Sequence, residues 1–202
     1  MAPAGRFVMT PAISKFIFVM LAVGWYAIRY KYARRSNRTP VARSARGPRE
    51  TALLLISLTG LGLLPLLYIC TGIPHFADYA FRPVQAWLGL LFAIVSLAMF
   101  QLTHRALGRN WSVSLDVRVD HKLITDGVYR QVRHPMYTAF WLWAFAQALL
   151  LPNWVAGFSG VVGFGILFFG RVSREERIML DAFGDQYREY MVRTYRVLPK
   201  IY

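Results

Sequence analysis

The sequence predicts an all-α integral membrane protein with about five transmembrane helices, a C-terminal helical hairpin and a polar pocket at the cytoplasmic face. Three observations carry this prediction. Hydrophobic residues make up 56% of the 202 residues, charged residues only 17%, and the mean hydropathy is positive at +0.36. Several uncharged stretches approach the length of a membrane span. Lys and Arg gather in alternate connecting segments between those stretches.

The N-terminal part contains two of the predicted spans. The first is the least regular, because only residues 16–28 are free of charge and a helix that begins near Met9 needs Lys15 to snorkel to the interface. A signal peptide is the alternative. No small-x-small cleavage site follows, whereas a dense basic stretch does, so we favour an uncleaved helix. The second span, residues 51–74, contains no charged residue.

Residues 83–103 form the third predicted span, and the last two form a hairpin. No charged side chain occurs between residues 135 and 170, and a single helix of that length would be about 54 Å long against a hydrocarbon core of roughly 30 Å. The chain must therefore fold back, and Leu151-Pro152-Asn153 is the predicted turn because Pro152 cannot donate a helical hydrogen bond. The resulting arms are residues 136–151 and 154–170.

The positive charges predict the orientation of these spans. Of the 24 Lys and Arg residues, 21 lie in the second, fourth and sixth of the six segments between and beyond the spans. This pattern places the N-terminus outside and the C-terminus in the cytoplasm, in a bacterial inner membrane or an equivalent membrane. The basic stretch over residues 29–49 also suits anionic lipid headgroups. Nucleic acid is a much weaker interpretation of the net charge of +14, because the cations sit where topology signals are expected.

The sequence gives little indication of disulfide bonds, metal sites or phosphate-binding loops. Cys70 is the only cysteine, so the sequence contains no disulfide framework and no thiolate metal site, and His75 and His104 lack metal-ligand spacing. We therefore predict that no metal is bound. Gly60 and Gly163 lie inside predicted spans and are interpreted as helix-packing sites rather than as parts of phosphate-binding loops. We predict an amphipathic helix over residues 178–195 that lies along the cytoplasmic membrane surface, with Asp185 as an N-cap.

Two polar clusters flank the uncharged hairpin, over residues 121–137 and 171–176, and the hairpin brings both to the same membrane face. Taken singly, their residues suit an ordinary interfacial loop with aromatic belts and headgroup anchors. The combination favours a binding site. A helix places Arg171 and Glu175 on one face at i, i+4, where the pair can hold a zwitterion at the edge of a membrane pocket.

Five ordered blocks of residues carry a resemblance to a known family. They are Leu107-Gly108-x-x-Trp111-Ser112, His121-Lys122-Leu123-Ile124-Thr125-x-Gly127-x-Tyr129, Arg133-His134-Pro135-x-Tyr137, Arg171-x-x-x-Glu175-Glu176, and Phe183-Gly184-x-x-Tyr187-x-x-Tyr190. In these blocks the sequence resembles the isoprenylcysteine carboxyl methyltransferases and their bacterial membrane relatives. The resemblance divides the chain into an N-terminal transmembrane region with a basic cytoplasmic loop, residues 1–81, and a catalytic region, residues 82–202.

The resemblance implies methyl transfer from S-adenosylmethionine to a lipophilic or lipid-attached acceptor that enters from the bilayer, foremost the carboxylate of an isoprenylcysteine-like substrate. Arg171 is implied as the catalytic and acceptor-binding residue, and we prefer Glu175 to Glu176 as the partner of the cofactor ammonium because of its i, i+4 relation to Arg171. The implied cofactor-binding positions are His121, Lys122, Leu123, Ile124, Tyr129, His134, Pro135, Met136, Tyr137 and Glu175.

Three alternatives remain open at the level of sequence. Relatives are associated with phospholipid amines or small thiols, so the acceptor is not fixed. A sterol-type NADPH reductase shares a stretch like Arg133-His134-Pro135-x-Tyr137, but there the tyrosine is followed closely by Gly-Glu, whereas here Thr138-Ala139-Phe140 follow. A non-catalytic membrane scaffold would use the polar clusters only to bind headgroups.

Overall fold

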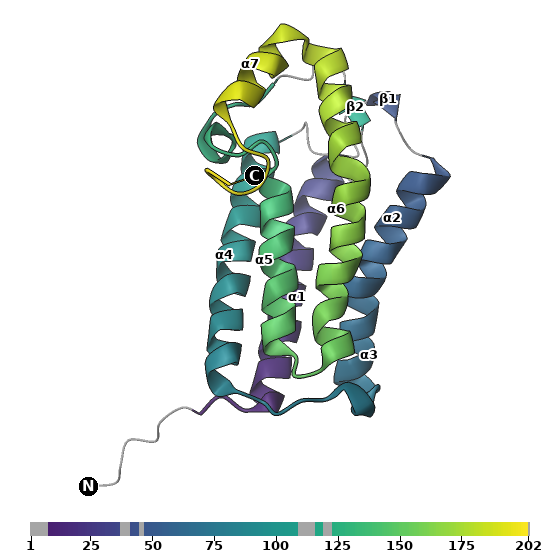
Figure 1. Cartoon of the computed structure of the whole chain (residues 1–202), viewed down its shortest axis with the longest axis vertical. Coiled ribbons are helices and arrows are strands. Elements are labelled where there is room, and N and C mark those ends of the chain that lie inside the picture. The colour runs from purple at the N-terminus through teal and green to yellow at the C-terminus, as the bar shows by residue number, and fades with distance from the viewer. Residues whose placement is uncertain (1–7, 37–40, 45–46, 109–115, 119–122, 202) are drawn as a thin grey trace, which may run out of the picture.

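The computed structural model describes residues 8–36, 41–44, 47–108, 116–118 and 123–201. Figure 1 shows an elongated bundle whose long helices run along one axis, with a short C-terminal helix over one end. The helices are α1 (Pro11–Ser36), α2 (Pro48–Leu58), α3 (Leu64–Thr71), α4 (Pro83–Leu107), α5 (Pro135–Leu150), α6 (Trp154–Phe183) and α7 (Asp185–Arg193). Short helical turns complete them: the π-helical η1 (Thr59–Leu63) and the 3-10 turns η2 (His75–Ala77) and η4 (Gly127–Arg130).

Proline opens four of the long helices, at Pro11, Pro48, Pro83 and Pro135. The fixed φ of proline suits the first helical turn. Backbone N–H groups in that turn have no partner within the helix, so proline, which lacks this group, loses no hydrogen bond there. The first predicted span, whose sequence is the least regular, is a continuous helix of 26 residues, α1. It begins two residues after Met9, where the sequence predicts.

Four helical segments are long and apolar enough to cross a membrane: Pro11–Arg34, Pro48–Thr71, Pro83–Leu107 and Trp154–Phe183. Helix α5, the remaining predicted span, has 16 residues and a length of about 24 Å, less than the usual hydrocarbon thickness. Only 11% of the apolar window of α1 is buried within the protein, against 61% for α6. Exposure of so much apolar surface to water is unfavourable, so outer helices such as α1 are suited to contact with lipid.

The second predicted span is one helical rod with a π-helical turn in its middle. Pro65 cannot donate to the carbonyl of Leu61, so the regular hydrogen-bond ladder is interrupted at this point. The carbonyl oxygen of Gly60 in the same turn accepts hydrogen bonds from Ser159 Oγ at 2.7 Å and from Gln147 Nε2 at 3.0 Å. The π-helical turn η1 is therefore hydrogen-bonded to both arms of the hairpin.

Gly60 and Gly163 face each other at this crossing. A Cβ atom on Gly60 would collide with the carbonyl oxygen of Ser159, and one on Gly163 would lie 2.8 Å from the carbonyl oxygen of Ile56. The interpretation of both glycines as packing sites is confirmed. Close approach of the two backbones is what requires them.

Gly60→Ala is expected to destabilise the protein by about 1 to 3 kcal/mol, the usual cost of inserting a methyl group into a closely packed contact. The measurement is thermal unfolding of the detergent-purified protein. Gly62→Ala is the matched control, because a Cβ atom there would meet only the Leu58 side chain, at 3.6 Å. Equal losses at the two positions would contradict the packing role of Gly60.

The hairpin turn is confirmed at Leu151-Pro152-Asn153, between α5 and α6. Asn153 Oδ1 accepts from Ala156 N at 2.8 Å and caps α6, while its Nδ2 donates to Pro74 O at 2.7 Å and to Asp78 Oδ1 at 2.8 Å. The buried side chain of Asn153 therefore caps the second arm of the hairpin and links the hairpin turn to the loop after α3.

The structure departs from the all-α prediction in one small feature. Residues Val41–Ser44 (β1) pair antiparallel with Asp116–Arg118 (β2) in a two-stranded sheet. The pairing connects the basic segment after α1 with the segment after α4, at the end of the bundle that carries α7 (Figure 1). The backbone of the basic segment is thereby joined to the segment that precedes the first polar cluster.

Candidate active site at the ends of helices α5 and α6

Helix α6 runs through the second polar cluster and places Arg171, Glu175 and Glu176 on its last turns. The first cluster reaches the same end of the bundle, because His134 is the N-cap of α5 and Tyr137 lies on the first turn of that helix. The sequence predicts this convergence from the hairpin, and the structure confirms it. The described side chains of the two clusters are in direct contact.

The helix predicted over residues 178–195 is wrong in its start. Helix α6 continues to Phe183 and ends where Gly184 takes a φ of +54°, a conformation that favours glycine. Helix α7 then begins at Asp185, with Gly184 and not Asp185 at the N-cap position. The carboxylate of Asp185 instead accepts from Arg188 Nη1 at 3.3 Å.

Glu176 is an internal anchor with several partners. Its Oε1 accepts from Arg133 Nε at 3.1 Å, and its Oε2 accepts from Arg196 Nη2 at 2.8 Å. His134 Nε2 lies 3.4 Å from Oε1. Glu176 is only 4% exposed, so its charge is compensated inside the protein by groups from the start of α5 and from the C-terminal segment.

Glu175 has a different environment although it is the next residue. Its side chain is 31% exposed. Tyr137 Oη donates to Glu175 Oε2 at 2.5 Å, and His134 Nδ1 lies 3.9 Å from Oε1. Of the two neighbouring glutamates, Glu175 is therefore the more exposed one.

Arg171 lies one helical turn before Glu175, and its guanidinium is flanked by two carboxylates. Its Nε is 3.9 Å from Glu175 Oε2, and its Nη1 is 2.9 Å from Glu50 Oε1 on α2. Both members of the second pair are buried, with 8% of Arg171 and 2% of Glu50 exposed. A residue from the N-terminal half of the chain thus borders the site.

The C-terminal segment holds the start of α5 in position. His134 N donates to Arg196 O at 2.9 Å, and Arg133 N donates to Tyr195 O at 2.7 Å. The guanidinium of Arg133 also donates to the carbonyl oxygens of Met191, at 3.1 Å, and of Thr194. These bonds fix the backbone of His134 independently of its ring, so the ring is presented to both glutamates.

A second, mainly aromatic cluster adjoins the site. Tyr129, Tyr187 and Tyr190 are buried together, with Leu123 and Ile124 packed against them. Tyr190 Oη donates to Tyr129 O at 2.7 Å. Burial, and then the negative charge of Glu175, raise the pKa of Tyr129 well above its usual value, so its phenol stays protonated and able to donate.

The structure therefore brings four predicted site residues into one contact network: His134, Tyr137, Arg171 and Glu175. Pro135 and Met136 form the start of α5 beside them, and Leu123, Ile124 and Tyr129 belong to the adjoining aromatic cluster. His121 and Lys122 lie outside the described residues.

Sequence reasoning missed Glu50 and Arg196 as neighbours of the site. Arg196 gave no signal among many basic residues. Glu50 did give one, because it is the only acidic residue before Asp78 and directly precedes an uncharged span. A lone carboxylate at the end of a membrane helix indicates a buried cationic partner.

Comparisons with known proteins match the region that contains this network. Residues 87–181 match the model of the isoprenylcysteine carboxyl methyltransferase family. A protein-S-isoprenylcysteine O-methyltransferase of Schizosaccharomyces pombe is 37% identical over 82 residues, 41% of this chain and 35% of that protein. A probable protein-S-isoprenylcysteine O-methyltransferase of Oryza sativa subsp. indica is 30% identical over 130 residues, 63% of this chain and 66% of that protein.

A solved structure extends the likeness of fold to most of the chain. The eukaryotic intramembrane Ras methyltransferase, an isoprenylcysteine carboxyl methyltransferase, superposes with a TM-score of 0.61 and 21% sequence identity, covering 96% of this chain and 70% of that one. The chain spans between about a third and two thirds of the length of the two relatives described above.

Proposed function

We propose, on the premise that residues 87–181 belong to the isoprenylcysteine carboxyl methyltransferase family, that this chain transfers a methyl group from S-adenosylmethionine to the carboxylate of a lipophilic, isoprenylcysteine-like acceptor. The observation that carries the proposal is the convergence of His134 and Tyr137 with Arg171 and Glu175 at one end of an apolar bundle. Relatives matched over this region are named protein-S-isoprenylcysteine O-methyltransferases.

The residues present suit the amino-acid part of S-adenosylmethionine, whose sulfonium supplies an electrophilic methyl group. Glu175 offers a partly exposed carboxylate to an ammonium, at the strength of a charge-assisted hydrogen bond. Tyr137 orients this carboxylate through its 2.5 Å hydrogen bond. The ring of His134 is proposed to turn from the glutamates and donate to the cofactor carboxylate, and backbone groups near Leu123 and Ile124 are proposed to contact the adenine.

Methyl transfer to a carboxylate needs no general base, because the acceptor is already ionised. Alignment of the two reactants and exclusion of water are the main requirements. Arg171 is proposed to bind one acceptor oxygen and leave the other directed at the methyl group, since its planar guanidinium matches a carboxylate. The low exposure of Arg171 limits competition from water.

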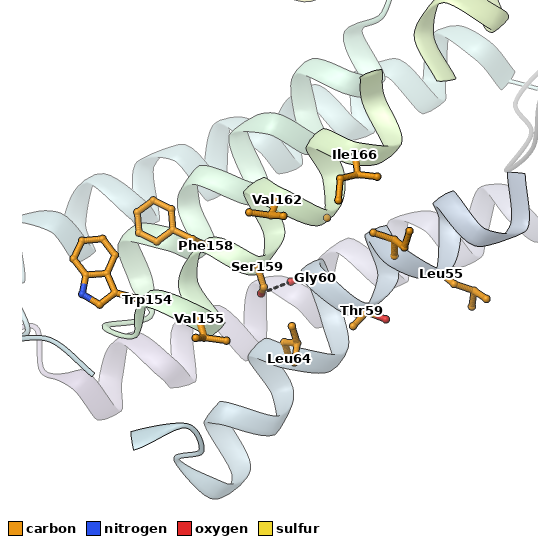
Figure 2. A pocket seen from close by; sticks show the side chains of 12 residues that line it. Leu55, Thr59, Gly60, Leu64, Trp154, Val155, Phe158, Ser159, Val162 and Ile166 are labelled. Carbon is orange, nitrogen blue, oxygen red and sulfur yellow. Dashed lines mark hydrogen bonds between the residues drawn. The ribbon is translucent and has the colours of Figure 1, made fainter. Parts of the chain in front are cut away.

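An apolar groove supports a lipophilic acceptor. It has a volume of about 520 Å³ and runs between η1 with its flanking helices and α6. Figure 2 shows Leu55, Leu64, Phe158, Val162 and Ile166 around it, with Ser159 bonded to Gly60 at its floor. Leu55 and Ile166 each lie five positions, about 7.5 Å along a helix, from Glu50 and Arg171 respectively. We propose that a hydrocarbon tail in this groove brings its head group to Arg171.

Calorimetric titration of the detergent-purified protein tests the cofactor assignment. S-adenosylhomocysteine is expected to bind, whereas NADPH and buffer alone give no heat of binding. Binding of NADPH alone would favour a sterol-type reductase, and binding of neither would favour a scaffold. Turnover against a prenylcysteine carboxylate analogue, a phosphatidylethanolamine and a small alkyl thiol then identifies the acceptor class.

The proposed orientation places the site in the cytoplasm. Asp78 lies beside the α5–α6 turn, because it pairs with Asn153, whereas Asp185 begins α7 at the other end of the bundle (Figure 1). Cysteine substitutions at Ser44 and Asp185 are expected to react with a probe from the cytoplasm, and a substitution at Asp78 only from the opposite side. Labelling of Asp78 and Asp185 from the same side would contradict the topology.

A further inference from the structure

Glu50 is a buried acidic residue outside the region that matches the family model. It lies on the first turn of α2, is 2% exposed and approaches Arg171 Nη1 to 2.9 Å. A glutamate near a helix N-terminus is stabilised by the helix dipole, which accounts for an acidic residue on this turn. The dipole does not account for the burial of the carboxylate against an arginine from another helix. Burial of a carboxylate is strongly unfavourable unless a well-placed partner compensates its charge.

Arg171 is held from two directions. Glu50 contacts Nη1 from α2, and Glu175 lies 3.9 Å from Nε on the same helix as the arginine. Two ion pairs at different nitrogens restrict the movement of a guanidinium more than either ion pair does alone. The contact from α2 is the shorter one and does not depend on whether Glu175 is occupied by a ligand.

We infer that Glu50 is a positioning residue that orients the guanidinium of Arg171 toward the acceptor carboxylate. This inference rests on the proposed function and adds α2 to the acceptor site. The cofactor is expected to engage Glu175 and so weaken its hold on Arg171, whereas the ion pair between Glu50 and Arg171 is expected to persist. The apolar groove lies between the same two helices, so a single helix pair would position both the tail and the head group of the acceptor.

The test compares Glu50→Gln with Arg49→Gln in the whole chain of 202 residues. Arg49 is the preceding residue, and it also connects α2 to α6, through Nη2 to Gly170 O at 3.3 Å. We measure kcat and KM with N-acetyl-S-farnesylcysteine, the affinity for this analogue in the presence of S-adenosylhomocysteine, and the affinity for S-adenosylhomocysteine alone. Glu50→Gln is expected to raise KM and weaken analogue binding by roughly tenfold or more, the scale of a misplaced binding group, with cofactor affinity changed by less than about twofold. Arg49→Gln is expected to match wild type in all three.

Two further variants keep the test decisive. If Glu50→Gln does not fold, Glu50→Asp retains the charge but withdraws the carboxylate by one methylene, and the same rise in KM is expected. In an Arg171→Lys background, Glu50→Gln is expected to add less than about twofold, because no planar fork remains to be oriented. A purely structural role would instead add its full effect in both backgrounds.

An unchanged KM in the Glu50 variants of an active enzyme overturns the inference and leaves the proposed function intact. Parallel loss of cofactor and acceptor affinity also overturns it, since general distortion then explains the effect. Wild-type protein that neither binds nor methylates the analogue removes the proposed function and this inference together.

Discussion

Glu175→Gln is expected to weaken S-adenosylhomocysteine binding by about 1.5 to 3 kcal/mol, or roughly 10- to 150-fold in Kd, the scale of a hydrogen bond between charged groups. The glutamine keeps an oxygen that can accept from Tyr137 Oη, so the change isolates the charge that the cofactor ammonium requires. Glu175→Ala is expected to bind at least as weakly, because it also leaves the phenol of Tyr137 without this acceptor. Calorimetry on the detergent-purified variants measures both.

Glu176 provides the contrasting position for this prediction. Its carboxylate compensates Arg133 and Arg196 inside the protein, so Glu176→Ala is expected to destabilise the fold by about 3 to 5 kcal/mol, as when one member of a buried ion pair is removed. The fraction that remains folded is expected to bind S-adenosylhomocysteine better than Glu175→Ala does. Equal losses of affinity at the two positions would contradict the division of roles, and unchanged affinity at both would remove the cofactor site from this end of α6.

Much of the fold follows from simple lengths and charges. The uncharged stretch over residues 135–170 is too long for one span, and Pro152 with Asn153 indicates a turn near its middle, so the hairpin could be predicted without any family. The end of α6 could not be predicted from lengths and charges. Its helix continues across the change from apolar to polar residues, and hydropathy marks the membrane boundary rather than the helix boundary. Gly184, at a positive φ, is the residue that ends α6.

The site divides in the same way between local and long-range information. Arg171 and Glu175 were predictable because both lie on one helix, where spacing fixes their relation. The different roles of Glu175 and Glu176 depend on Arg133 and Arg196, which approach from segments distant in sequence. The ion pair of Glu50 with Arg171 likewise joins two helices whose relative rotation no periodicity specifies.

Arg171→Lys is expected to separate acceptor binding from cofactor binding. Lysine retains the positive charge that buried Glu50 needs, so the fold is expected to persist. It loses the planar fork that matches a carboxylate, because an ammonium is a compact point charge. With a prenylcysteine carboxylate analogue, we therefore expect kcat/KM to fall by roughly 10- to 100-fold, the scale of a reactant that is no longer held in line. The affinity for S-adenosylhomocysteine is expected to stay within about twofold, because Glu175 and His134 are untouched.

The same variant also discriminates among acceptor classes. Neither an amine nor a thiol needs the planar fork of an arginine. A nearby cation also opposes the ammonium that forms when an amine is methylated, whereas a methylated thiol is a neutral thioether. Wild type and Arg171→Lys are therefore compared on the carboxylate analogue, a phosphatidylethanolamine and a small alkyl thiol. Activity confined to the amine or the thiol, with Arg171→Lys indistinguishable from wild type, would exclude the carboxylate as acceptor while leaving methyl transfer intact. A loss confined to the carboxylate would assign Arg171 to its recognition, because the other two acceptors report on the same cofactor and the same apolar bundle.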